Sequence, residues 1–184
     1  MTPAQPSTLI RAAELAAALA DPARSLVVID TSFDLADTES GERRYRASHL
    51  PGSHYLHLDH DLSGAKTGRN GRHPLPERAA FARTVGALGI APGTPVVALD
   101  AQGGVYAARL WWMLRWLGHA EVAVLDGGVQ AWQRAGGVLS AEPTARPGGP
   151  PYPERASLAP HVDAAGVAAR SSTAPALRAT RCAP

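Results

Sequence analysis

Three short runs of continuous apolar residues divide the first 140 residues, and an aspartate follows each run. The runs occupy residues 26–29, 96–99 and 122–125, before Asp30, Asp100 and Asp126. They are rich in β-branched residues and do not alternate with polar ones, which is typical of parallel strands buried on both faces. A fourth strand is predicted over residues 54–59.

Helical stretches separate these runs, and glycines mark where they end. Helices are predicted over residues 76–88, 105–117 and 129–135, followed by Gly89, Gly118 and Gly136 as C-cap residues. A short amphipathic helix is predicted within the first twenty residues. Alternating strands and helices indicate an α/β domain, a mainly parallel sheet flanked by helices. Ligands of such sheets lie at the carboxyl ends of the strands, which directs attention to the three aspartates.

The composition changes near residue 140. Eight of the sixteen prolines lie beyond it, in a stretch without apolar periodicity. A chain of 184 residues is long enough for one ordinary domain with an extension. The sequence therefore predicts a globular domain over residues 8–139, a Pro-rich linker over 140–160, and, over 161–184, the remnant of a second domain or a disordered tail.

Charge and cysteine content exclude several classes of protein. The formal net charge is +2 and no basic block occurs, so neither nucleic acid nor an anionic membrane is an expected partner. The single cysteine, Cys182, excludes an internal disulfide and a multi-cysteine metal site. The first twenty residues lack the pattern of a signal peptide, and no apolar run is long enough to span a bilayer. A soluble protein of the reducing cytoplasm is predicted.

The segment after the second aspartate carries the most suggestive pattern for chemistry. A tight glycine-containing loop joins a strand to a helix, with the residues Asp100, Ala101, Gln102, Gly103, Gly104 and Val105. Such a loop turns backbone N–H groups toward one centre and adds the positive end of a helix dipole, which suits an anion or a thiolate. Asp100 stands where an activated cysteine would have to stand. A plain connector is the equally open interpretation.

At this point the sequence resembles a known family, the two-domain rhodaneses and 3-mercaptopyruvate sulfurtransferases, and specifically their amino-terminal domain. The resemblance covers about residues 9–139. It rests on the joint occurrence and spacing of the motifs Val28-Ile-Asp30, His49-Leu-Pro-Gly-Ser53, Gly71-Arg-His-Pro-Leu-Pro76, Arg109-Leu-Trp-Trp-Met-Leu-Arg115, Gly118-His119 and Leu125-Asp-Gly-Gly-Val-Gln-Ala-Trp132.

The resemblance implies a rhodanese-like fold and a place in sulfur transfer. In that family a cysteine of the carboxyl-terminal domain takes a sulfane sulfur from thiosulfate or 3-mercaptopyruvate as a persulfide and passes it to a thiophilic acceptor, without a cofactor. The amino-terminal domain typically has an aspartate at the equivalent strand end, as Asp100 does here, and shapes the substrate cleft. Since a carboxylate cannot carry sulfane sulfur, this chain is expected to be catalytically silent by itself.

Two functions of other classes compete with this interpretation. A rhodanese-related phosphatase would need a cysteine and an arginine where Asp100 and Tyr106 stand, which argues strongly against it. A non-enzymatic module that binds a partner or a small anion stays open. Coding sequence for a catalytic domain next to this one would distinguish the module from half of an enzyme.

The end of the chain departs from the family pattern. Residues 159–170 resemble the first helix of the second domain, but residues 171–184 contain no apolar run. We expect a truncated or frame-shifted product, which sequencing of the locus and its downstream flank would test. Cys182 has Arg178 and Arg181 nearby but no glycine loop or helix after it, so an incidental thiol is favoured over a nucleophile.

Histidines gather over residues 49–73, beside Asp59 and Asp61. On a strand the side chains of His54 and His57 would point to opposite faces, so convergence on a metal is not expected, and loop or sheet-edge roles are favoured. His49 matches the histidine of the family motif, for which the resemblance implies an accessory role in proton transfer. Fixing the turn before Pro51 and Gly52 is the alternative for His49.

Three residues of the helix after the loop are assigned supporting roles. Arg109 is predicted to pair with Asp100 or Asp126, or to support carbonyls of the loop. Trp112 and Trp116 are four residues apart and so share one helix face, which suits packing in the core or against a partner domain. If that face is uncovered, self-association through it is expected.

Overall fold

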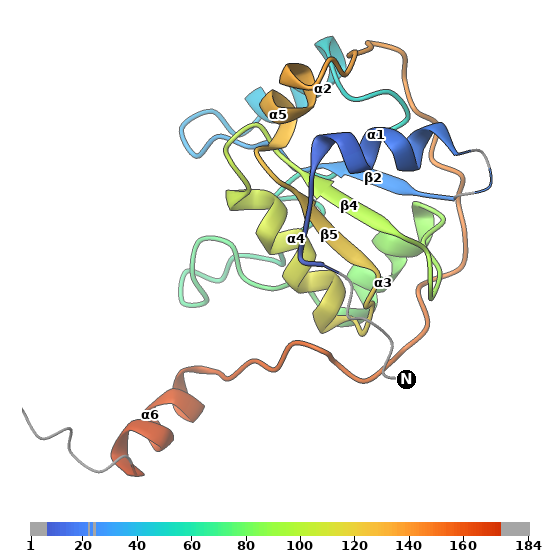
Figure 1. Cartoon of the computed structure of the whole chain (residues 1–184). Coiled ribbons are helices and arrows are strands. Elements are labelled where there is room, and N and C mark those ends of the chain that lie inside the picture. The colour runs from blue at the N-terminus through green and yellow to red at the C-terminus, as the bar shows by residue number, and fades with distance from the viewer. Residues whose placement is uncertain (1–6, 22, 24, 174–184) are drawn as a thin grey trace, which may run out of the picture.

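The computed structural model describes residues 7–21, 23 and 25–173. Five parallel strands form one sheet in the order β1-β5-β4-β2-β3. The strands are β1 (Leu9–Ile10), β2 (Val27–Asp30), β3 (His54–Tyr55), β4 (Val96–Leu99) and β5 (Val122–Leu125). The α/β class and the three apolar strands predicted from the sequence are confirmed, because β2, β4 and β5 lie side by side at the centre of the sheet (Figure 1).

Helices cover both faces of the sheet. They are α1 (Ala12–Ala20), α2 (Ser40–Ala47), α3 (Arg78–Ala87), α4 (Val105–Trp116), α5 (Gly128–Arg134) and α6 (Ala164–Thr173). Side chains of α3 and α4 share one apolar core with Val96 and Val122, while α1 and α5 share the other with Val97 and Leu125. Alternate residues of each central strand therefore serve opposite cores, which explains why these strands are continuously apolar.

The predicted helix ends agree closely with the structure. Gly89, Gly118 and Gly136 have φ angles of 73°, 90° and 84°, in the left-handed region that glycine adopts without steric cost. Gly118 meets a second requirement, because a Cβ there would lie 2.7 Å from the Ala156 carbonyl oxygen. No helix among the described residues is long and apolar enough to cross a membrane.

Two parts of the chain near the sheet edge differ from the prediction. The predicted strand over residues 54–59 is wrong beyond Tyr55, because the chain turns where the Asp61 carboxylate accepts the His57 N–H and the His57 carbonyl accepts the Asp61 N–H. Helix α2 was not predicted, since its sequence is mostly polar. It lies close to β2, where a Cβ on Gly41 would come within 1.9 Å of the Ser32 carbonyl oxygen.

Packing against the domain continues beyond Leu139. We call residues 140–160 the strap, because they run over the surface in extended form (Figure 1). The Tyr152 side chain belongs to the larger core and is 3% exposed. A single aromatic side chain has no periodicity to reveal it, which is why the sequence pattern missed it. The role of residues 140–160 as a linker stays a prediction.

Backbone contacts hold the strap along α3 and α4. Tyr152 N–H donates to the Ala82 carbonyl at 2.9 Å, and Leu158 N–H donates to the Arg115 carbonyl at 2.9 Å. A Cβ on Gly86 would lie 1.9 Å from the Pro150 carbonyl oxygen, so α3 needs a glycine there to let the strap approach. Helix α6 follows the strap and stands apart from the sheet in Figure 1.

His119 links the strap to the turn before β5 through a buried, titratable ring. The buried ring donates from Nε2 to the Glu121 carbonyl at 3.2 Å, which leaves Nδ1 to accept the Tyr152 hydroxyl at 3.2 Å. Burial lowers the pKa of His119, so the folded state favours the neutral ring. The unfolded chain, with a histidine pKa of about 6.5, then binds the proton more readily.

We expect the free energy of unfolding to fall as the pH is lowered from about 6.5 through the depressed pKa of His119. Urea unfolding at pH 8, 6.5 and 5 measures this loss. The His119→Gln variant keeps a donor and an acceptor but does not titrate, so its unfolding free energy should depend less on pH. An equal pH dependence in both proteins would contradict this role of His119.

Candidate functional site

The loop between β4 and α4 forms a cradle of backbone N–H groups at the carboxyl edge of the sheet. Gly103 and Gly104 have φ angles of 76° and 99°, which let the chain reverse within four residues. In the Asp100 side chain, Oδ1 accepts the N–H groups of Gln102 and Gly104 at 2.9 and 2.8 Å. Its Oδ2 accepts those of Tyr106 and Ala107 at 2.8 and 2.9 Å.

The Asp100 carboxylate therefore fills the cradle. Its side chain is buried, and its four donors include the first-turn amides of α4, where the helix dipole also favours negative charge. The predicted convergence of loop amides is confirmed, and the alternative of a plain connector does not account for four amides on one carboxylate. The arrangement stabilises an anion, and that anion is the chain's own side chain.

Neighbouring strand ends support the cradle through residues that the sequence interpretation did not single out. The Ser32 hydroxyl, just after β2, accepts the Ala101 N–H at 3.0 Å. Gln130 of α5 donates to the Ala101 carbonyl at 2.8 Å. A Cβ on Gly128 would lie 2.1 Å from the Asp100 carbonyl oxygen. The glycine at position 128 is the one feature of the sequence that could have indicated that α5 begins so close to the Asp100 backbone.

The other two strand-end aspartates differ from Asp100. Asp30 is buried, and its Oδ1 accepts the Ser32 N–H at 2.7 Å. Burial raises the pKa of the Asp30 carboxyl, and the nearby Asp100 charge acts in the same direction. Asp126 is exposed. The three apolar strands thus deliver three chemically distinct carboxyl groups to one edge of the sheet.

Arg109 pairs with neither Asp100 nor Asp126, so the predicted ion pair is wrong. Its guanidinium donates instead to the Leu62 and His73 carbonyls at 2.8 and 3.1 Å, with a longer contact to Pro74 at 3.4 Å. Because backbone amides already satisfy Asp100, that carboxylate has no need of a guanidinium. Arg109 therefore supports carbonyls, as the alternative expected, but those of residues 62–74 rather than of the cradle.

Trp112 and Trp116 do share one face of α4. Their rings stack with centroids 6.1 Å apart and an interplanar angle of 12°. The His161 ring, beyond the strap, stands edge-on to both at 6.3 and 6.5 Å. Both indoles are half-buried, so the face is partly covered by the chain itself. Its use as a domain interface or for self-association stays a prediction.

His49 is a buried structural link between α2 and the strap. Its Nδ1 lies 2.6 Å from the Tyr45 carbonyl oxygen and its Nε2 lies 3.1 Å from that of Glu142. Carbonyl oxygens only accept, so a neutral imidazole can satisfy one of them and an imidazolium both. The ring also stacks on Tyr45 at 4.1 Å. These contacts favour the structural alternative, and the accessory role in proton transfer stays a prediction.

Comparison with known proteins decides the family. The rhodanese-like domain family matches residues 11–135, which is more than half of the chain. The chain belongs to the rhodanese-like family. The resemblance inferred from the motifs is therefore confirmed.

Relatives of this rhodanese-like chain are sulfurtransferases that are longer than it is. It is 43% identical over 143 residues to a probable 3-mercaptopyruvate sulfurtransferase of Pseudomonas aeruginosa, covering 76% of this chain and 50% of the relative. It is 36% identical over 121 residues to the thiosulfate sulfurtransferase of Bos taurus, covering 65% and 40%. The chain thus spans about half the length of the curated relatives it matches.

Solved structures agree on the rhodanese fold. The 3-mercaptopyruvate sulfurtransferase of Leishmania major superposes with a TM-score of 0.72 at 30% identity, covering 82% of this chain and 41% of that one. SseA of Escherichia coli superposes with a TM-score of 0.74 at 24% identity, covering 91% of this chain and 62% of SseA. At that identity the superposition shows only that the two chains share a fold.

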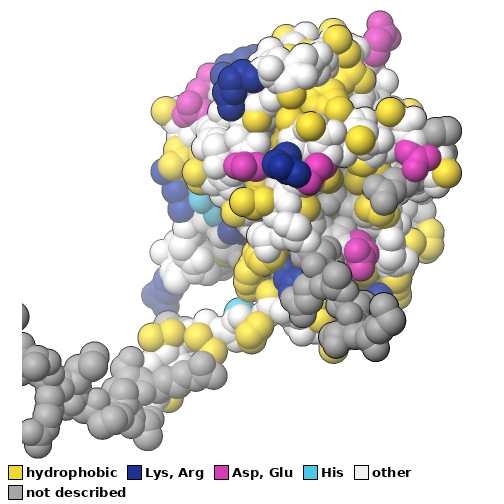
Figure 2. Space-filling view, viewed as in Figure 1, with side chains coloured by type: hydrophobic (Ala, Val, Ile, Leu, Met, Phe, Trp, Pro, Cys, Tyr) yellow, Lys and Arg dark blue, Asp and Glu magenta, His cyan; other side chains and the backbone are white. Residues whose placement is uncertain are grey.

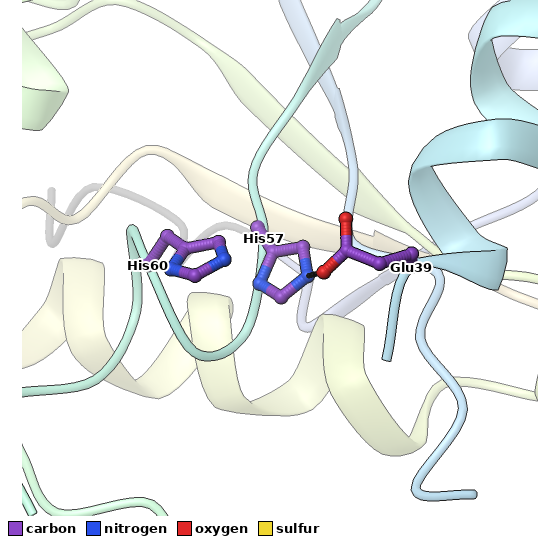
Figure 3. A group of neighbouring side chains, drawn as sticks. All are labelled: Glu39, His57 and His60. Atoms are coloured by element: carbon purple, nitrogen blue, oxygen red, sulfur yellow. Dashed lines mark ion pairs between the residues drawn. The ribbon is translucent and has the colours of Figure 1, made fainter. Parts of the chain in front are cut away.

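One group of side chains in the described part of this rhodanese-like chain has the composition of a metal site. Ligand atoms of Glu39, His57 and His60 lie within 4.8 Å of one another (Figure 3). The rings of His57 and His60 stack at 4.2 Å. The expectation that the histidines do not converge is therefore wrong for this pair, because the turn after β3 brings together what a strand would have separated.

The hydrogen bonds of His57 do not fit a metal ligand. Its Nδ1 accepts the Asp59 N–H at 3.1 Å, so the ring proton resides on Nε2, which lies 3.0 Å from the Thr38 carbonyl. A metal on Nε2 would move that proton to Nδ1, against the Asp59 N–H, and would break both bonds. We assign His57 to the structure of the turn.

Cys182 lies outside the described residues, so the structure does not test its prediction as an incidental thiol.

Charged side chains on the visible face of the rhodanese-like domain are dispersed, with dark blue and magenta interspersed rather than gathered by sign (Figure 2). That face offers no electrostatic footprint for a nucleic acid.

Proposed function

We propose that this chain is a non-catalytic rhodanese-like domain of a sulfurtransferase. It would act by packing against a cysteine-bearing partner domain and shaping a cleft for small sulfur-containing anions such as thiosulfate or 3-mercaptopyruvate. By itself it would transfer no sulfur. The reducing cytoplasm predicted from the cysteine content suits thiol chemistry of this kind.

The occupied cradle carries the proposal. Sulfur transfer of the family type needs a thiolate that attacks the donor and then carries sulfane sulfur as a persulfide. Here four amides that would stabilise such an anion are satisfied by the Asp100 carboxylate. A carboxylate holds charge at this position but forms no persulfide. The relatives' greater length supports the need for a second domain.

A sulfurtransferase assay tests the proposal. The purified chain is incubated with thiosulfate or 3-mercaptopyruvate as donor and cyanide as acceptor, with the thiosulfate sulfurtransferase of Bos taurus as the positive control. We expect no turnover above the rate without protein, from either the chain or its Cys182→Ser variant. Turnover that disappears in the variant would show that the tail cysteine reaches a sulfur-binding site and would overturn the proposal.

A further inference from the structure

An exposed loop over residues 65–72 carries the only asparagine of the chain, Asn70, and a glycine follows it. The base of the loop is closed, because the Gly64 N–H donates to the Pro74 carbonyl at 3.0 Å. Asn70 and Gly71 are both exposed on the part that projects from this base. When glycine follows asparagine, no Cβ obstructs the approach of the next backbone nitrogen to the side-chain amide.

The backbone nitrogen of Gly71 is accessible and unbound. In the described part of the chain its N–H makes no hydrogen bond to another residue. A Cβ built on Gly71 would meet nothing within 4 Å, so the space beside the nitrogen is open. Arg69 and Arg72 flank the pair in the sequence, and nearby positive charge favours loss of the proton from this nitrogen. Gly71 therefore offers an available nucleophile.

The Asn70 amide is held in a way that polarises its carbonyl group. Its Oδ1 accepts the Thr67 N–H at 2.9 Å, and its Nδ2 donates to the Ala65 carbonyl at 2.8 Å. A donor on Oδ1 stabilises the negative charge that develops there when a nucleophile adds to the amide carbon. The loop thus supplies an electrophile next to the nucleophile.

We propose that Asn70 is a site of spontaneous deamidation in the folded chain. The Gly71 nitrogen loses its proton and bonds to the amide carbon of Asn70, and the bond from that carbon to Nδ2 breaks, which releases ammonia. The succinimide that results takes up one water molecule, which opens the ring at either carbonyl and leaves an aspartate or an isoaspartate. The proposal goes beyond the proposed function, because neither the cradle nor a partner domain takes part.

Deamidation would change the charge of the loop that leads to His73. Lys66 pairs with Asp59 at 2.8 Å, and Nδ1 of His73 lies 3.1 Å from the same carboxylate. The ionisable side chains of the loop are all cationic, namely Lys66, Arg69 and Arg72. The product places a carboxylate among these cations, where it competes with Asp59 for Lys66. It also removes the Nδ2 donor that ties the loop to the Ala65 carbonyl.

Incubation of the full chain at pH 8 and 37 °C, followed by intact mass and peptide mapping, tests the proposal. We expect a progressive gain in mass equal to the exchange of an NH₂ for an OH, located at residue 70. Methylation of the same peptide by a protein isoaspartate methyltransferase should identify the isoaspartate product. An unchanged residue 70 would overturn the proposal.

A synthetic peptide of residues 66–73 gives the rate of the same reaction without the fold. Because an exposed loop opens at little cost in free energy, we expect the folded chain to react within about tenfold of the peptide's rate. A rate in the folded chain that is lower than this would mean that the hydrogen bonds of Asn70 protect it, and would overturn the proposal.

Variants separate the chemistry from strain in the loop. Gly71→Ala places a Cβ beside the reacting nitrogen and should slow deamidation about tenfold. Gly68→Ala is the matched control, because the φ angles of Gly68 and Gly71 are 80° and 85° and both have open space around them. It should leave the rate within about twofold of wild type, since Gly68 does not follow the asparagine. Equal slowing by both substitutions would overturn the assignment of the Gly71 nitrogen as the nucleophile.

Discussion

The Asp100→Ala variant should lose about 3–5 kcal/mol of unfolding free energy, because it leaves four converging amides without an acceptor. Each unsatisfied buried donor costs about 1–3 kcal/mol, and water reaches part of the exposed loop to reduce the sum. Urea unfolding followed by circular dichroism measures the loss. Asp100→Asn, which keeps one oxygen acceptor but places an NH₂ group against donors, should fall between Asp100→Ala and wild type.

Asp126→Ala is the matched control for this substitution. Asp126 also follows a central strand at the same edge of the sheet, but its side chain is exposed. Its loss should change the unfolding free energy by less than about 0.5 kcal/mol. Equal destabilisation by the two substitutions would mean that the cradle does not depend on the carboxylate.

An added anion should recover part of the stability that Asp100→Ala loses. Acetate supplies the missing carboxylate, and thiosulfate tests whether the vacated cradle accepts a sulfur oxyanion. Binding to the folded state alone stabilises a protein by mass action, so the unfolding midpoint of the variant should rise with acetate concentration. Wild type at the same ionic strength should show no such rise, because its cradle is already filled.

The Tyr152→Ala variant should be destabilised by about 3–5 kcal/mol, as is typical when a buried aromatic side chain is truncated. The ring lies in the larger core although it comes from a Pro-rich segment. Urea unfolding measures the change, and hydrogen exchange at Tyr152 N–H reports whether the strap detaches from α3. The strap should detach before the sheet unfolds, since few other apolar side chains hold it.

Two further substitutions test whether the loss comes from the buried Tyr152 ring. One removes only its hydroxyl, and the other truncates a different apolar side chain of the strap. Tyr152→Phe removes only the hydrogen bond to His119 and should cost about 1 kcal/mol. Leu158→Ala removes an exposed apolar side chain of the same segment and should cost less still. If Tyr152→Ala proves no worse than Leu158→Ala, the strap is not part of the folding unit.

The sequence was sufficient for the central architecture, because the deciding interactions are local. Continuous β-branched runs can be buried on both faces only as central parallel strands, and β2, β4 and β5 are such strands. Glycines mark helix ends because few other residues adopt a positive φ, as Gly89, Gly118 and Gly136 do. The loop after Asp100 was predictable for the same reason, since Gly103 and Gly104 dictate how its amides turn.

Features that depend on contacts between distant segments were not predictable from pattern. Arg109 finds carbonyls about 35 to 47 residues away, and no local signal distinguishes these from an aspartate. Tyr152 is buried because Gly86 lets the strap approach, a relation between residues 66 positions apart.

The sequence by itself determined the parallel α/β fold, the carboxyl edge of the sheet as the place of the candidate site, and an aspartate rather than a cysteine before the glycine-containing loop. Periodicity, turn chemistry and residue identity act over a few neighbours and can be read in order along the chain. Only the tertiary structure decided that Asp100 fills its own cradle with four hydrogen bonds, and that Tyr152 of the strap lies buried in the larger core. These facts depend on which distant groups meet, and burial and hydrogen bonding across the fold determine that.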